Sequence, residues 1–143
     1  MQRHVTELGR RLQHYRARDW KIELDGANLS GRYLLWHAMN IRSVGPVLRL
    51  AADAKTNDGT FDFVGAREED RRLLHDYFDA RTAGKRRKFP LPAKPFKKMR
   101  LRWKKSSLHF DDEIWPEKDE SPPGACDIEI IVKASALGIW WIE

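Results

Sequence analysis

The N-terminal segment of the chain carries apolar side chains at helical spacing. Val5, Leu8, Leu12 and Tyr15 follow one another at intervals of three, four and three, which places them on one stripe of a helix. The pattern predicts a helix over residues 2–17, with arginines on its other faces. A stripe this narrow needs a surface of the protein to lie on.

A second helix is predicted over residues 67–84. Acidic residues at positions 68–70 occupy its first turn, where they interact favourably with the helix dipole, and Gly84 is placed to end it. Its apolar face is expected to contact the core through Leu73, Leu74, Tyr77 and Phe78.

The segment between the helices has the patterns of strands. Residues 20–25 alternate between apolar and charged side chains, as a half-buried strand does, and Asp25-Gly26 marks the turn after it. Residues 32–40 form a mostly apolar run that suits a strand covered on both faces. His37 lies in this run without a partner motif, so we interpret it as a hydrogen-bonded core or groove histidine and not as a ligand.

A hairpin is predicted around the polar turn Asn57-Asp58-Gly59. The β-like runs at residues 47–50 and 60–64 flank this turn, whose residue types tolerate the backbone angles of a tight turn. Taken alone, such a hairpin is common in antiparallel proteins and carries no chemistry.

The second half of the chain is predicted to consist of strands. Residues 96–104 alternate, with apolar residues facing one way and basic residues the other. Short runs at 108–110 and 114–115 bracket Asp111-Asp112 and predict a hairpin. The last two strands are expected at 127–133 and 136–142.

These elements define the expected fold class. Eight or nine short strands follow one another without helical crossovers, which favours a mainly β (α+β) protein: an antiparallel β-sandwich or barrel-like domain with one or two helices. A chain of 143 residues with 41% apolar residues and six tryptophans is expected to form one folded domain with a core of its own.

Cysteine content and hydropathy narrow the cellular setting. The single cysteine, Cys126, excludes an internal disulfide, and we expect it near a strand start without a catalytic role. The arginine-rich segment 1–20 is not a signal peptide, and no apolar run is long enough to span a bilayer. We therefore expect a soluble, cytoplasmic protein, with peripheral association at a membrane left open.

The order of several short motifs resembles a known family. Gly45-Pro46, Ala52-Asp53-Ala54, the turn at 57–59 followed by Phe61-Asp62, and Asp111-Asp112-Glu113 are similar in sequence and spacing to the C-terminal domain of diacylglycerol kinase and sphingosine kinase-like lipid kinases. The resemblance runs from about Trp20 to the end. It divides the chain into residues 1–19, a helix linking to a nucleotide-binding domain that is missing here, and residues 20–143, the β domain.

The resemblance implies candidate catalytic residues. In that family an Asp-Gly-Glu segment lies at the cleft between the domains, and its Glu is considered the base that receives the proton of the lipid hydroxyl. The matching positions are Asp111 and Glu113, with Asp112 in place of the glycine. The extra charge of Asp112 is expected to raise a neighbouring carboxylate pKa. The alternative is a solvated hairpin tip without a catalytic role.

The resemblance also implies a weak metal site at Asp58. The family has an Asp-Asp-Gly segment near a structural metal, and Asn57 replaces its first Asp here. Loss of one carboxylate weakens a site for a hard cation, which prefers charged oxygen ligands.

The nucleotide half of such an enzyme is not found in this chain. No glycine-rich phosphate loop is present, and nothing matches the Gly-Gly-Asp-Gly-Thr motif with which the family binds ATP. We therefore expect no cofactor in this chain, with ATP and Mg held by the nucleotide-binding domain of an intact enzyme. Residues 32–40 would help to form the lipid pocket, and the chain alone would be inactive. A homo-oligomer is left open.

Charge is unevenly distributed along the chain. The net charge is +6, yet residues 85–105 hold eleven Lys or Arg and no acid, while residues 111–120 hold six acids and one Lys. This basic surface is not part of the family pattern. Three interpretations stay open: anionic lipid headgroups, nucleic acid as the less favoured partner, or a solvated face. Its expected members are Lys85, Arg86, Arg87, Lys88, Lys98, Arg100, Arg102 and Lys104.

Overall fold

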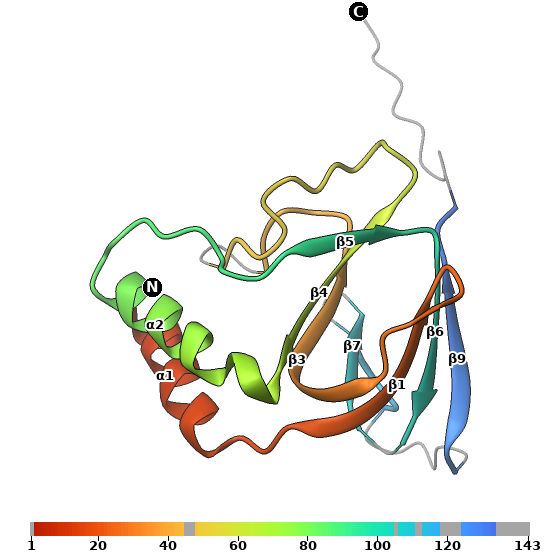
Figure 1. Ribbon diagram of the computed structural model, residues 1–143, viewed down its shortest axis with the longest axis horizontal. Helices are drawn as coiled ribbons and strands as arrows, with labels where there is room; N and C mark the ends of the chain where they lie inside the picture. The colour runs from red at the N-terminus through yellow and green to blue at the C-terminus, as the bar shows by residue number, and fades with distance from the viewer. Residues whose placement is uncertain (1, 45–47, 105, 111–112, 118–123, 134–143) are drawn as a thin grey trace, which may run out of the picture.

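A computed structural model describes residues 2–44, 48–104, 106–110, 113–117 and 124–133. Within them the chain forms a strongly curved antiparallel sheet, two α-helices beside it and a separate small hairpin (Figure 1). The helical elements are α1 (Gln2–His14), the 3-10 turn η1 (Glu68–Asp70) and α2 (Arg71–Thr82). The strands are β1 (Arg18–Leu24), β2 (Ala27–Asn28), β3 (Gly31–Met39), β4 (Phe61–Arg67), β5 (Ala93–Phe96), β6 (Lys98–Trp103), β7 (Leu108–Phe110), β8 (Glu113–Trp115) and β9 (Cys126–Ile131).

The main sheet is open and follows the order β5-β4-β3-β1-β6-β9, with β2 paired to β1. All of its pairs are antiparallel, and within the described part of the chain β7 and β8 pair only with each other. The prediction of a mainly β (α+β) domain with two helices is confirmed. The described strands of the main sheet form one continuous curved path.

Strand β1 is shared between the two halves of the sheet. Its first residues pair with β3, beginning with Arg18 opposite Tyr33, and its last four residues pair with β6. Because β3 runs past the start of β1, the residues of β3 after Tyr33 pair with β4 alone among the described strands. The sheet therefore diverges here, and this divergence makes room for the groove described below.

Strands β5 and β6 are separated by Lys97 only, although they lie in different halves of the sheet. The turn after β1 fixes this corner. Asp25 has a positive φ of 47°, its amide donates to the carbonyl of Lys98, and its carboxylate accepts hydrogen bonds of 2.8–3.2 Å from the amides of Lys97 and Lys98. The predicted Asp25-Gly26 turn is confirmed, and Gly26 also has a positive φ.

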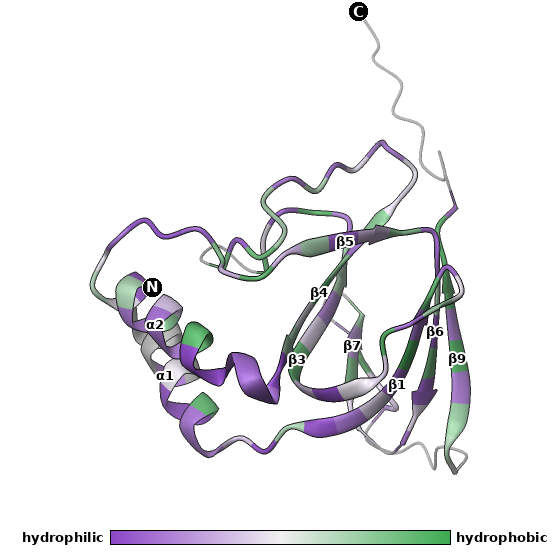
Figure 2. Cartoon of the chain, in the orientation of Figure 1, coloured by the Kyte–Doolittle hydropathy of each residue, from purple (hydrophilic) through white to green (hydrophobic). Residues whose placement is uncertain are grey.

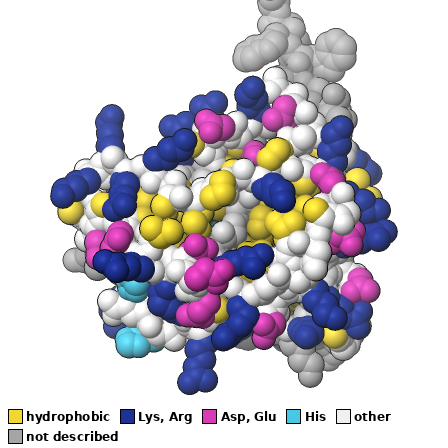
Figure 3. All heavy atoms as spheres, viewed as in Figure 1, with side chains coloured by type: hydrophobic (Ala, Val, Ile, Leu, Met, Phe, Trp, Pro, Cys, Tyr) yellow, Lys and Arg dark blue, Asp and Glu magenta, His cyan; other side chains and the backbone are white. Residues whose placement is uncertain are grey.

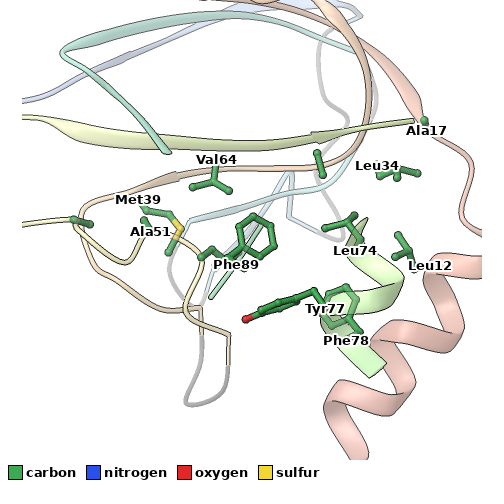
Figure 4. Packing of buried hydrophobic residues seen from close by; sticks show 13 residues of the cluster. Leu12, Ala17, Leu34, Met39, Ala51, Val64, Leu74, Tyr77, Phe78 and Phe89 are labelled. Atoms are coloured by element: carbon green, nitrogen blue, oxygen red, sulfur yellow. The ribbon is translucent and has the colours of Figure 1, made fainter. Parts of the chain in front are cut away.

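The protein has two hydrophobic clusters, one on each side of β3 and β4. The first joins the helices to the sheet: Leu74, Tyr77 and Phe78 of α2 lie close to Phe89 and Val64 (Figure 4). The second includes side chains of β1, β4 and β6, among them the fully buried Met99 and Trp103. Hydrophilic residues dominate both helices with single hydrophobic positions between them, as expected of helices that lie on a surface (Figure 2).

The two helices are held together by Arg71. Its guanidinium donates to the carbonyl oxygen of Leu12 near the end of α1 and to that of Tyr15 just after it, and it forms a 2.6 Å ion pair with Glu68. The predicted first helix therefore ends earlier than expected, at His14, where Arg71 binds the free carbonyls of its last turn. Leu12 is buried as predicted, whereas Tyr15 is 42% exposed.

Two predictions about packing were wrong. The described residues of the run, 48–50, do not pair with residues 60–64: Leu48 forms an isolated bridge with Val44, and β4 pairs with β3 and β5. The longer apolar strand β3 offers β4 more pairing and more burial than a short run interrupted by Arg49 does. Leu73, expected in the core, is 42% exposed because the buried stripe of α2 is centred on Leu74, Tyr77 and Phe78.

Other predicted strands are confirmed. The second half of the sheet contains β6 with its alternate residues buried, and β9 begins at Cys126. The hairpin predicted from the runs on either side of Asp111-Asp112 is present as β7 and β8. Residues 136–142, predicted as the last strand, lie outside the described residues.

Candidate functional site

An apolar groove of about 530 Å³ opens where the sheet diverges. It is lined by residues 33–38 of β3, by residues 107–110 of β7 and the segment before it, and by side chains of β1, β6 and β9. The large apolar residues of its walls outside the hairpin tip are Trp20, Leu34, Leu35, Trp36, Phe61, Leu101, Leu108 and Ile130. A concave site of this size with mostly apolar walls is typical of a small-ligand site.

Aromatic rings form one wall of the groove: Trp20, Tyr33 and Trp36 line it, and the buried Phe63 packs against Tyr33 and Trp36. Trp20 and Trp36 meet edge to face with ring centroids 5.2 Å apart, and Trp36 stacks on Phe63 at 6.4 Å. Tyr33 meets Phe63 edge to face at 6.0 Å. Gly65 leaves the space for the last pair, because a β-carbon there would lie 2.7 Å from Cε1 of Tyr33. These contacts join β1, β3 and β4 into a rigid surface.

Polar side chains in the groove are few. Among the described residues its lining contains no Asp, Glu, Lys or Arg, and its imidazoles are those of His37 and His109. Burial lowers the pKa of His37, and the neighbouring His109 lowers it further. His37 is the groove histidine that the sequence suggested, but no hydrogen bond to it is found within the described structure.

The candidate base Glu113 lies on the same hairpin that helps to line the groove. It is the first residue of β8, is exposed, and is paired with Phe110, which itself lines the groove. A smaller hollow of about 370 Å³ is lined in part by Glu113, Ile114 and Trp115. The other candidate, Asp111, and its neighbour Asp112 lie outside the described residues.

Asp58 lies in the long connection between β3 and β4. Its carboxylate accepts hydrogen bonds of 3.0 and 2.9 Å from the amide and the hydroxyl of Thr60, and these bonds lower its pKa. Burial and the charges of Asp58 and Asp53 raise the pKa of Asp62. Among the described residues no group of three His, Cys, Asp or Glu side chains is arranged to hold a metal, so metal binding through Asp58 stays a prediction.

The structure divides the predicted basic surface into two parts. On the strand β6, Lys98 and Arg100 both pair with Glu129 of β9 at 2.8 and 2.9 Å, and Arg102 pairs with Asp127 at 3.0 Å. All three strand cations are thus paired with the neighbouring strand, although its two carboxylates leave one net positive charge, whereas Lys104 is exposed just after the end of β6.

The loop cations are different. Lys85, Arg86, Arg87 and Lys88 are all exposed, and within the described residues none of them forms an ion pair. Arg87 donates to the carbonyl oxygen of Asp76, which holds the loop against α2. Lys and Arg side chains surround the rim of the face in Figure 3, while hydrophobic side chains gather in its middle.

Sequence reasoning located β3 as a pocket strand but missed most of the groove. Trp20, Leu101 and Leu108 belong to elements that the fold brings to β3 from elsewhere in the chain, so no local pattern marks them. One feature of the sequence could have indicated His109, namely its position on the predicted hairpin that carries the candidate base Glu113. The structure brings Glu113 to the groove's hairpin, but no hydrogen bond or ion pair joins it to Asp58 among the described residues.

The fold is similar to that of diacylglycerol kinase-like proteins. One solved structure from Bacillus anthracis strain Sterne matches 87% of this chain with 14% identity and a TM-score of 0.57, and another from the same strain matches 86% with 16% identity and a TM-score of 0.54. At these identities the likeness establishes the fold. The chain corresponds to 40% and 42% of the length of those two proteins.

Searches by sequence add no further relationship. No family model matches the chain, and no curated protein matches it significantly. Neither helix of the described structure has the length and apolar character needed to cross a bilayer.

Proposed function

We propose that this chain is the lipid-facing half of a diacylglycerol or sphingosine kinase-like enzyme. In the intact enzyme, a separate nucleotide-binding domain would hold ATP and Mg, and this half would present the lipid hydroxyl. The observation that carries the proposal is the lipid-kinase-like fold with an apolar groove lined by β3.

The groove supplies the binding energy for the lipid. Its aromatic wall of Trp20, Tyr33 and Trp36 is pre-formed, so an alkyl chain buried against it gains about 0.8 kcal/mol for each methylene removed from water. Phosphoryl transfer depends largely on positioning and electrostatics, so a rigid wall that orients the lipid is itself part of the chemistry.

Glu113 is the proposed general base. Its exposure at the start of β8 suits a residue that completes its site only when another domain covers it, and Asp111 lies close to it in the sequence. In the proposed reaction the carboxylate would receive the proton of the lipid hydroxyl as the hydroxyl oxygen attacks the γ-phosphorus, and the bond from that phosphorus to the β–γ bridging oxygen would break as ADP leaves.

Two measurements test this proposal. Dioctanoylglycerol should quench or shift the tryptophan fluorescence of the chain, and Phe110→Asp, which places a charge in the groove lining, should weaken its binding at least tenfold. Ile114→Asp is the matched control, because Ile114 is exposed on the same hairpin but does not line the groove. Equal affinities of the two variants for dioctanoylglycerol would show that the lipid does not bind in the groove.

Activity provides the second measurement. The chain alone, with ATP, Mg and dioctanoylglycerol, should release no ADP above the background without lipid, because the phosphate-binding elements lie elsewhere. Lipid-dependent ADP release by the pure chain would contradict the assignment to one half of an enzyme.

A second role, contact with an anionic lipid surface, is favoured by the loop cations. The four consecutive loop cations are exposed and form no ion pair in the described structure, so they can bind headgroups without breaking one. Lys98, Arg100 and Arg102 would first have to break their ion pairs with Glu129 and Asp127. This role is compatible with a lipid substrate and places the loop 85–88, and not β6, at the surface.

A further inference from the structure

Two histidines, His37 and His109, line the groove described above. His37 comes from β3 and His109 from the middle of β7, two strands that are not paired with each other, and both line the same groove. They are close enough for the charge of one to disfavour charge on the other. Two imidazoles thus line one groove whose described residues include no Asp, Glu, Lys or Arg.

No described anionic group of the protein balances these imidazoles. The described lining of the groove holds no carboxylate, and neither histidine makes a hydrogen bond to another described residue. Lysine and arginine are likewise absent from the described lining, so the two imidazoles are the basic side chains that it holds. Polar groups shielded from water are usually hydrogen-bonded, and the half-buried His37 has no such partner among the described residues, which leaves room for an acceptor from a ligand.

The other titratable groups described around the pair do not supply such an acceptor. The tyrosines of the lining are Tyr15 and Tyr33, and the Tyr33 hydroxyl already donates to the carbonyl oxygen of Leu29 at 2.6 Å. Across the β3–β4 ladder His37 is paired with Val64, which carries no charge. The side chains that β1, β6 and β9 contribute to the described lining are apolar.

We propose that His37 and His109 bind the anionic head of a single-chain amphiphile whose alkyl chain lies in the same groove, against the apolar residues of its lining. The head is a carboxylate or a phosphate monoester, since either offers several acceptor oxygens to two N–H donors. The phosphate case rests on the proposed function, because a phosphate monoester is what phosphorylation of a lipid hydroxyl produces. The carboxylate case is independent of it.

This proposal gives the groove a pH dependence. A bound anion favours the charged form of an imidazole, so binding takes up protons, and the affinity should rise as the pH falls. A neutral amphiphile of the same chain length lacks this coupling. The groove would therefore select the charged ligand under mildly acidic conditions.

The test uses the full chain and four probes: decanoate, decyl phosphate, decan-1-ol and inorganic phosphate. Isothermal titration at pH 8 and pH 6 should show decanoate, ionised at both values, binding about tenfold more tightly at pH 6, while decan-1-ol changes less than twofold. Decyl phosphate binding more tightly than decanoate identifies the phosphate source, and the reverse order identifies the carboxylate source. Inorganic phosphate should bind at least a hundredfold more weakly than either, because it lacks the chain.

Variants distinguish recognition by the histidines from a general effect of pH. His37→Gln and His109→Gln should each reduce the pH dependence for decanoate to less than threefold and leave decan-1-ol binding within twofold of the wild type. His14→Gln is the control, since His14 is exposed at the end of α1 and does not line the groove. His109 is exposed, so its replacement should be tolerated by the fold even where that of His37 is not.

The possible results separate this proposal from the lipid-kinase assignment. Decanoate and decan-1-ol that bind with equal pH dependence, unaffected by the histidine variants, overturn the histidine proposal while leaving a lipid groove in place. Absence of binding by every alkyl probe overturns both proposals. Anion-dependent binding together with failure of dioctanoylglycerol to bind supports the histidine proposal and removes the neutral-lipid assignment.

Discussion

Gly65 and Tyr33 approach so closely that a β-carbon on Gly65 would lie 2.7 Å from Cε1 of the tyrosine ring. Tyr33 also receives the guanidinium of Arg67 over its ring, 5.3 Å from the centroid. The ring is therefore confined between two strands and a cation, at the end of the aromatic wall of the groove. Only glycine permits this arrangement without moving the ring.

Gly65→Ala should therefore displace Tyr33 and Phe63. Overpacking in a filled core lowers the free energy of unfolding by about 1–3 kcal/mol, and urea denaturation measures this. Gly124→Ala is the control, because a β-carbon at Gly124 meets no atom within 4 Å. An unchanged midpoint for Gly65→Ala would show that the ring has another place to go.

Asp25 is expected to control the corner between β5 and β6. Asp25→Ala removes the acceptors for Lys97 and Lys98 and places alanine at a positive φ, so it should lower the free energy of unfolding by about 1–3 kcal/mol. Asp25→Asn keeps an acceptor oxygen and tolerates the left-handed conformation, and should lose less than half as much. Equal losses for the two variants would exclude the side-chain acceptor as the cause.

Arg71 is expected to fasten α1 to the rest of the protein. Arg71→Met removes the donors to Leu12 and Tyr15 and should lower hydrogen-exchange protection in α1 at least tenfold while leaving β3 and β4 protected. Arg72→Met is the matched control, because Arg72 is exposed one position away. Protection lost equally throughout the sheet would indicate global and not local destabilisation.

The ion pairs of Glu129 should respond to acid. Hydrogen bonds from Lys98 and then Arg100 hold the Glu129 pKa below its ordinary value of 4.5. A lowered folded-state pKa stabilises the protein above the unfolded pKa, and this contribution is lost as the pH falls through the folded-state pKa. Glu129→Gln should thus lower Tm slightly at pH 7, with the difference from wild type disappearing in the acid range below 4.5.

The control for this pH series is Glu69→Gln, since Glu69 is exposed and forms no ion pair within the described residues. Its difference from wild type should not follow the same curve. A Glu129→Gln effect that persisted unchanged at pH 2 would refute the role of the carboxylate charge.

The loop 85–88 should dominate binding to anionic membranes. At about 1 kcal/mol for each cation near the surface, replacing all four with Gln should lower partitioning onto vesicles with phosphatidylserine about a thousandfold at low salt. Replacing Lys98, Arg100 and Arg102 with Gln should have a much smaller effect, because these residues are paired. A salt-dependent titration with single-stranded DNA, run in parallel, decides whether nucleic acid is the better partner.

Local patterns were enough to predict most elements of this fold. The alternation in β6, the Asp25-Gly26 turn and the β7–β8 hairpin depend on residues near one another in sequence, so their signals are strong. The pairing of β4 could not be predicted in this way, because a long connection separates β3 from β4 and the competing run at 47–50 lies within that connection. Proximity in sequence favoured the wrong partner.

The candidate site was predicted only in part, for a related reason. Apolar β3 suggested a pocket wall, but the opposite wall is assembled from β1, β6, β7 and β9, whose arrangement depends on the whole sheet. The charge pattern of β6 correctly predicted cations on a solvent-facing side of the strand, but it gave no sign of their ion pairs. Their partners Glu129 and Asp127 lie on β9, beyond the intervening β7–β8 hairpin, and no local feature reveals that pairing.

The division of β1 between β3 and β6 has a consequence for synthesis on the ribosome. The first half of β1 can find β3 soon after both have emerged, but its second half has only the short β2 as a neighbour until β6 follows, after the whole of β4, α2 and β5. During that interval Ile22 and Leu24, almost fully buried in the finished protein, have no lasting cover. A nascent chain that stalls before Trp103 should thus be a preferred target for chaperones.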